Sequence, residues 1–108
     1  MDPKQVPIYS ARDDDPDLQE ELSEFVIGLA EEIDRLQDTE ADGDLERLGE
    51  LCHDLGDRAQ RYGYEILAEV AFAVCQGCRE HKPESAQQGL VQLTDVVQRI
   101  RRGHRGAA

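Results

Sequence analysis

The histidine at position 53 is the residue of this sequence best placed for covalent chemistry. It falls within an apolar pattern of helical spacing over residues 45–62. At about 100° per residue, it projects about 150° away from the centre of that apolar stripe, into solvent. Near pH 7 an exposed imidazole offers a neutral nitrogen that can act as a nucleophile. Gly49 and Gly56 flank His53 about one turn away, although glycine inside a helix costs roughly 1 kcal/mol relative to alanine. The two glycines suggest that something docks closely on this face.

A second candidate for chemistry is the Cys-x-x-Cys spacing of Cys75 and Cys78, with His81 three residues further on. Zinc would need a fourth ligand, which Cys52 could supply, and ligands that converge on one point. Along a helix, however, positions 75, 78 and 81 drift around the axis, so His81 lies far round from Cys75. The alternative is that Cys52 and Cys78 are small core residues, because free cysteine is among the most buried residue types. We therefore expect neither metal nor cofactor, and leave open whether Cys75 and Cys78 bind anything.

Apolar residues recur at steps of three and four in four segments, and no segment alternates as a strand would. The four stripes are Leu18, Leu22, Phe25, Val26, Leu29, Ile33 and Leu36; then Leu45, Leu48, Leu51, Cys52, Leu55, Ala59 and Tyr62; then Leu67, Val70, Ala71, Val74 and Cys78; and last Ala86, Leu90, Leu93, Val97 and Ile100. Four amphipathic helices joined by short connections predict an all-α fold, an antiparallel four-helix bundle.

Helix-capping and helix-breaking residues mark the boundaries of these segments. Asp15 suits the N-cap of the first helix, with Pro16 at its first position. Pro83 prevents the third helix from continuing, and Ser85 is placed to cap the fourth. Three further signals mark boundaries. The apolar pattern breaks over 39–43, Asp44 can cap the second helix, and Gly63 lies at the junction of the second and third helices.

The chain of 108 residues has the length of one domain with one core. We expect a short N-terminal arm over 1–14, in which Val6, Ile8 and Tyr9 can pack against the body. The bundle is expected over 15–103, and a disordered tail over 104–108.

Composition excludes several classes of function. A net charge of −12 disfavours binding to nucleic acid, which needs a basic surface. No apolar run is long enough to cross a membrane, and the N-terminus lacks the apolar core of a signal peptide. An odd number of cysteines fits the reducing cytoplasm better than a disulfide framework. We expect a cytoplasmic monomer, with a helical homodimer as the alternative.

The residues around His53 resemble a known family. Leu51–Leu55, followed by Ala59, Tyr62 and Gly63, is similar to the signature of histidine-containing phosphotransfer (HPt) domains: an exposed histidine, an apolar residue two positions on, and a small and an aromatic residue before a glycine. The resemblance extends over roughly residues 8–102 and implies the same four-helix fold.

The resemblance implies a carrier of phosphoryl groups in two-component signalling, rather than an independent enzyme. His53 would accept a phosphoryl group from a receiver-domain aspartate and donate it to another, so the expected partners are a response-regulator receiver domain, a histidine kinase, or both. The phosphoryl environment and docking surface would comprise Gly49, Glu50, Gly56, Asp57, Gln60 and Tyr64.

Two positions depart from the family pattern. Gly56 stands where the family has lysine, and Asp57 stands where it has glycine. The lysine would offset phosphoryl charge, and the glycine would leave space over the imidazole. The departures favour an alternative function: a degenerate HPt-like adaptor that binds a receiver or a histidine kinase without carrying phosphate.

Overall fold

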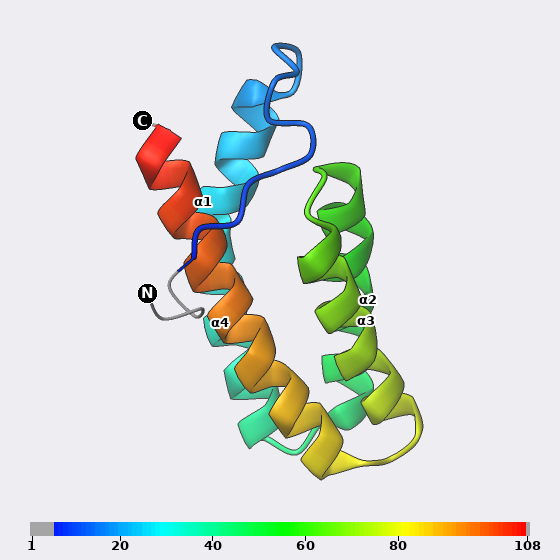
Figure 1. The fold of residues 1–108 in the computed structure, drawn as a ribbon. Coiled ribbons are helices and arrows are strands. Elements are labelled where there is room, and N and C mark those ends of the chain that lie inside the picture. The colour runs from blue at the N-terminus through cyan, green and yellow to red at the C-terminus, as the bar shows by residue number, and fades with distance from the viewer. Residues whose placement is uncertain (1–5, 108) are drawn as a thin grey trace.

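The computed structural model describes residues 6–107 and consists of four α-helices joined by short connections (Figure 1). The helices are α1 (Gln19–Ala41), α2 (Leu45–Arg61), α3 (Glu65–Arg79) and α4 (Pro83–Ala107). No strand occurs in this part of the chain. The all-α fold class predicted from the four apolar stripes is confirmed.

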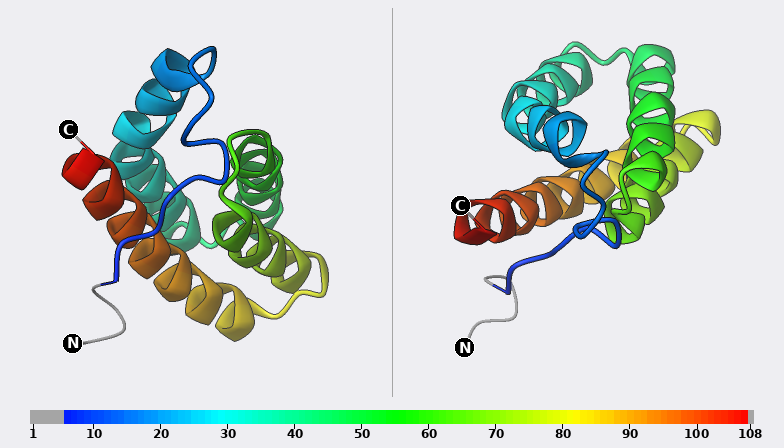
Figure 2. Two further views of the ribbon diagram at one scale, coloured as in Figure 1. Left: turned by 45° about the horizontal axis from the view of Figure 1, so that its top comes forward. Right: turned by 90° about the horizontal axis from the view of Figure 1, so that it is seen from above.

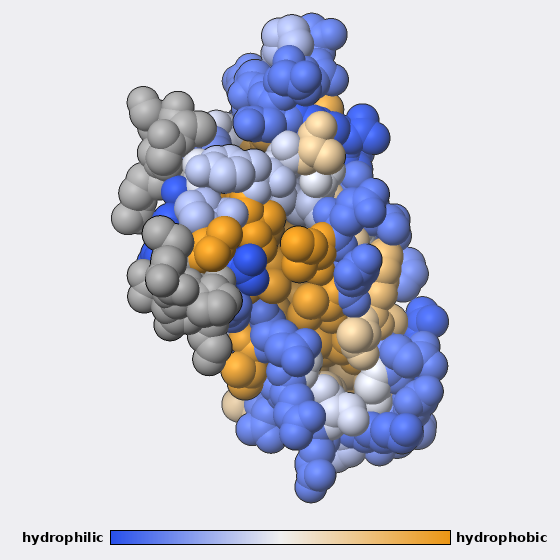
Figure 3. Space-filling view, in the orientation of Figure 1, coloured by the Kyte–Doolittle hydropathy of each residue, from blue (hydrophilic) through white to orange (hydrophobic). Residues whose placement is uncertain are grey.

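The helices form a bundle in which each packs against its neighbours along the chain and α4 returns to α1. Two further views show α2 and α3 as a close pair on one side of the bundle, with α1 and α4 on the other (Figure 2). The interface between α2 and α3 is the most extensive. The face that α3 and α4 present in Figure 3 has apolar surface in its middle and hydrophilic surface at both ends.

The predicted apolar stripes supply the core. In α1, every residue of the stripe after Leu18 is buried, and Leu18 itself is partly exposed. Fully buried large side chains come from all four helices, as the bundle requires: Val26, Leu29, Leu36, Leu48, Leu55, Leu67, Val74, Leu93 and Ile100. Burial of about 25 cal/mol per Å² of apolar surface is the main force that holds the four helices together.

The predicted start of α1 is wrong by about one turn, because α1 begins at Gln19. Asp15 Oδ1 instead accepts a hydrogen bond from the Asp17 backbone N–H at 3.0 Å, and the Leu18 N–H donates to the Asp15 carbonyl at 3.2 Å. Asp15 therefore caps a separate turn that leads into the helix. Asp44 is the N-cap of α2 as predicted, accepting from the Arg47 N–H at 3.0 Å.

The start of α4 also differs from the prediction. The helix begins at Pro83, and the Ala86 N–H donates to the Lys82 carbonyl at 3.0 Å, so Ser85 lies in the first turn and is not the cap. Proline is well suited to a first helical position because it has no N–H to leave unsatisfied. The preceding helix, α3, ends at Arg79 with Glu80 as its C-cap, before Pro83 is reached.

The N-terminal arm is hydrogen-bonded to α4 and to the turn between α2 and α3. The Ile8 N–H donates to the Arg99 carbonyl at 3.0 Å, and the Ala11 N–H donates to the Gly63 carbonyl at 2.9 Å. Of the three apolar residues expected to pack, Ile8 is buried, whereas Val6 and Tyr9 are 40% and 57% exposed. Residues 1–5 of the predicted arm lie outside the described residues.

The C-terminal end of α4 continues past Gly103, where the sequence predicted a disordered tail. The helix runs to Ala107, and His104 Nε2 lies 3.2 Å from Ser23 Oγ of α1. Gly103 is buried, and a Cβ there would come within 2.6 Å of the Ile8 carbonyl oxygen. The close approach of the arm to Gly103 explains why the helix does not end there.

No described helix is long and apolar enough to cross a membrane.

Candidate functional site

The α2 helix presents His53 to solvent in its middle. Leu48, Cys52, Leu55 and Ala59 face the core and are completely buried. The His53 side chain projects from the outer surface of the same helix and is 49% exposed. The helical geometry predicted from the sequence therefore holds at this position.

Two side chains contact the imidazole of His53. Asp57, one turn further along α2, places its Oδ2 atom 3.5 Å from Nδ1 of His53. From α3, Phe72 places its ring centroid 5.6 Å from the imidazole centroid, with the two planes inclined at 54°. Asp57 thus lies on the Nδ1 side of the ring, and Nε2 is the ring nitrogen farther from the carboxylate.

The two glycines beside His53 lie at the contact between α2 and α3. Both are buried, and each meets a residue of α3. A Cβ at Gly49 would lie 3.2 Å from Cys78 Cβ, and one at Gly56 would lie 2.4 Å from Phe72 Cε1. Their small size allows α3 to approach α2 closely, and this internal contact accounts for glycine at both positions. From helical spacing alone, a glycine that accommodates a neighbouring helix cannot be distinguished from one that accommodates a partner protein.

The exposed residues around His53 are predominantly acidic. Glu50 and Asp57 have side chains that are 63% and 62% exposed, and Gln60 is also exposed on this helix. The Arg58 guanidinium donates hydrogen bonds to Glu32 of α1 and to Asp54. Hydrogen bonding to Glu32 raises the pKa of Arg58. Glu50 lies 3.9 Å from the Arg47 guanidinium, whereas Asp57 is the carboxylate beside the imidazole.

Tyr64 is not part of this surface. The sequence predicted it partly exposed near His53, but it is 3% exposed and its ring lies 6.1 Å from that of Phe25. Burial, with a smaller contribution from Asp13, raises the pKa of Tyr64 to about 12. Tyr62 is the half-buried tyrosine of the pair, with its ring 4.9 Å from Phe25. The two tyrosines flank the Gly63 turn, whose direction the local sequence does not specify.

The three cysteines are buried within the interface between α2 and α3. Burial raises the pKa of Cys52 to about 12 and also raises that of Cys78. His81 lies in the connection after α3 with φ of 56°, and together with Cys78 and Glu50 it lines a cavity of about 350 Å³. Among residues 6–107, no group of three or more histidine, cysteine or acidic side chains could hold a metal ion.

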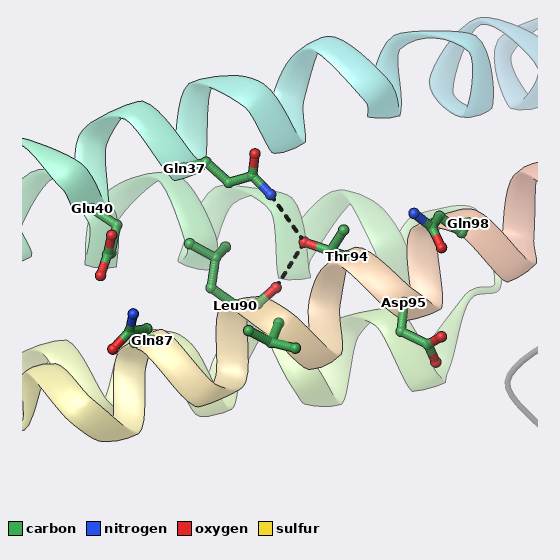
Figure 4. A pocket seen from close by; sticks show the side chains of 8 residues that line it. Gln37, Glu40, Gln87, Leu90, Thr94, Asp95 and Gln98 are labelled. Atoms are coloured by element: carbon green, nitrogen blue, oxygen red, sulfur yellow. Dashed lines mark hydrogen bonds between the residues drawn. The ribbon is translucent and has the colours of Figure 1, made fainter.

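A groove that the sequence did not indicate lies between α1 and α4 (Figure 4). It has a volume of about 420 Å³, and its walls combine apolar surface, to which Leu90 and Val91 contribute, with amide and carboxylate groups: Gln37, Glu40, Gln87, Asp95 and Gln98. The Gln37 amide donates to Thr94 Oγ1 at 3.4 Å across the groove, and Thr94 donates to the Leu90 carbonyl at 2.9 Å. This groove belongs to the α1–α4 side of the bundle, whereas His53 lies against α3.

Phe72 is the residue of the site that sequence reasoning missed. It lies off the buried stripe of α3, and only the pairing of α3 with α2 brings it to His53. Its partner Gly56 carried the available signal, since a glycine buried within a helix requires a close neighbour.

Comparisons of the chain with family models, curated proteins and solved structures find no match. The candidate site is therefore defined by its geometry: an exposed imidazole in the middle of α2, held between a carboxylate and an aromatic ring.

Proposed function

We propose that this chain is a phosphorelay carrier of the HPt type, in which His53 accepts a phosphoryl group from a receiver-domain aspartate and donates it to another. The observation that carries the proposal is the His53 imidazole, which is 49% exposed on a rigid bundle with Asp57 beside Nδ1. A carrier must present its nucleophile to two different partners. An exposed histidine on the outer surface of α2 meets that requirement.

The proposed transfer uses the nitrogen that faces away from Asp57. Nε2 of His53 attacks the phosphorus of the aspartyl phosphate, an N–P bond forms, and the acyl P–O bond breaks as the aspartate carboxylate leaves. The proton stays on Nδ1, and the negative charge of the Asp57 carboxylate, 3.5 Å from Nδ1, balances the positive charge of the phosphorylated ring. The return reaction reverses these steps.

A second function, an adaptor that binds a receiver or histidine kinase without carrying phosphate, is favoured by the charges of the site. Asp57 and Glu50 would repel an incoming phosphoryl group, and Arg58 is engaged by Glu32 and Asp54. An adaptor still binds its partner through the same surface, and the acidic residues make that binding sensitive to salt.

Transfer from phosphorylated receiver domains separates the two functions. Wild type, His53→Gln and His81→Gln are each incubated with a panel of labelled receivers; His81 is an exposed histidine outside the site and provides the matched control. A carrier is labelled in wild type and in His81→Gln, and not in His53→Gln. An adaptor is labelled in none of the three, yet all three bind a receiver. Labelling that persists in His53→Gln would contradict the carrier assignment.

The Asp57→Asn variant tests whether charge limits the transfer. Asparagine has nearly the same shape as aspartate and keeps an acceptor oxygen beside Nδ1, but removes the negative charge. If repulsion limits acceptance, the variant is labelled faster than wild type. Restoring the lysine of the family pattern at Gly56 is a poorer test, because any side chain there would collide with the Phe72 ring.

A further inference from the structure

The Phe72 ring occupies the place where a side chain at position 56 would lie. A Cβ built on Gly56 would come within 2.4 Å of Phe72 Cε1 and within 2.7 Å of both Cδ1 and Cζ. The ring is partly buried and lies directly on the α2 backbone. From there it also reaches the imidazole of His53, at 5.6 Å between centroids. Gly56, Phe72 and His53 thus form one contact chain across the α2–α3 interface.

We infer that Phe72 is a positioning residue for His53 and that Gly56 is required to seat it. An exposed side chain on a helix surface ordinarily exchanges between rotamers on the picosecond to nanosecond timescale. His53 is restrained on two sides, by the Phe72 ring on one and by Asp57 at Nδ1 on the other. The importance of this restraint for phosphoryl transfer rests on the proposed function, whereas the restraint itself does not.

The inference gives the buried glycine a specific role. Glycine is unfavourable inside a helix, and both Gly49 and Gly56 are buried in α2. At Gly49 the nearest neighbour is Cys78 Cβ at 3.2 Å, a contact between helices that does not involve Phe72. At Gly56 all three nearest atoms belong to the Phe72 ring. A methyl group at 56 therefore displaces the ring, and displacement of the ring releases the imidazole.

Loss of the restraint has a calculable effect on rate. If His53 is held in one χ1 rotamer and a variant lets it spread evenly over the two staggered wells that a helix allows, the competent fraction falls to about one half. Phosphorylation of His53 would then slow by about twofold. Larger losses would require that the ring also contacts the phosphoryl donor.

The test measures the rotamer and the reaction separately on the full chain. NMR three-bond couplings report χ1 of His53 in wild type, Phe72→Leu, Phe72→Tyr, Gly56→Ala and Gly49→Ala. We expect one rotamer in wild type, in Phe72→Tyr, which keeps the ring, and in Gly49→Ala. Averaged couplings are expected in Phe72→Leu and Gly56→Ala. A residue with only a structural role would lower stability without changing the His53 couplings.

Labelling by phosphoramidate, a small phosphoryl donor, then follows in the same five proteins. Wild type and Phe72→Tyr should react about twice as fast as Phe72→Leu. Unchanged His53 couplings in Phe72→Leu would overturn the positioning role, whatever the labelling shows. If the couplings change as expected while wild type accepts no phosphate, the proposed function fails and the positioning role stands. Should Phe72→Leu not fold, the comparison of Gly56→Ala with Gly49→Ala decides the question by the same couplings.

Discussion

Replacement of Gly63 by alanine is expected to destabilise the protein strongly, because this residue joins the N-terminal arm to the bundle. Gly63 has a φ of +80°, and its Cβ would come within 2.7 Å of Ser10 Oγ and 2.9 Å of the backbone nitrogens of Ala11 and Arg12. A left-handed conformation costs an L-residue about 1–2 kcal/mol. The collision also removes two hydrogen bonds, Ser10 Oγ–H to the Tyr62 carbonyl and Ala11 N–H to Gly63, worth about 1 kcal/mol each. The expected loss of unfolding free energy is about 3–4 kcal/mol.

Gly43→Ala provides the matched control for this prediction. Gly43 occupies the equivalent turn between α1 and α2 with a φ of +75°, but a Cβ there has no neighbour within 4 Å. The variant therefore carries only the conformational cost of about 1–2 kcal/mol. Both changes are glycine to alanine, so their effects on the unfolded chain cancel in the comparison. Urea unfolding measures both losses. Equal destabilisation of the two variants would show that the arm is not anchored at Gly63.

Three further predictions concern stability. Gly28→Ala should raise the unfolding free energy by about 0.5–1 kcal/mol in urea unfolding, since Gly28 lies within α1 and a Cβ there meets nothing within 4 Å. Burial raises the pKa of both Cys52 and Tyr64 to about 12, from 9.0 and 10.0. Between these pKa values the unfolded chain releases protons that the folded chain keeps. The unfolding free energy therefore falls by about 1.4 kcal/mol per pH unit for each group as pH rises. Cys52→Ala should make this alkaline slope shallower, and an unchanged slope would contradict the raised pKa of Cys52. Arg58→Ala should lower the unfolding free energy by about 1–2 kcal/mol, because the Glu32 side chain, only 15% exposed, loses its partner. The additional change Glu32→Gln should restore part of the lost stability.

The fold could be predicted from the sequence because the helical signals are local. Apolar spacing identified all four helices, and Asp44 capped α2 as its residue type indicated. The errors fell at the helix ends, where proline permits more than one solution. At Asp15 the carboxylate caps a turn one step before the helix, and at Pro83 the proline itself begins α4. At Gly103 the helix packs against the arm, a contact between distant parts of the chain, and it continues beyond this residue.

The site was predictable only in the part that lies on one helix. The exposure of His53 and the proximity of Asp57 follow from helical geometry. The contact of Phe72 with Gly56 and the burial of Tyr64 depend on how α3 packs against its neighbours, and no local pattern encodes that packing. The glycines in α2 were correctly identified as points of close approach, but the approaching group is α3 itself.

The central claim, that His53 accepts a phosphoryl group, is tested most directly without any partner protein. Wild type, His53→Gln and the control His81→Gln are incubated with phosphoramidate, and intact mass is followed before and after acid treatment. Since His53 is exposed, its replacement should change the unfolding free energy by less than about 0.5 kcal/mol, so loss of reaction cannot reflect loss of fold. We expect one acid-labile phosphoryl group in wild type and in His81→Gln, and none in His53→Gln. An adduct that survives in His53→Gln, or a folded wild type that accepts no phosphate, would contradict it.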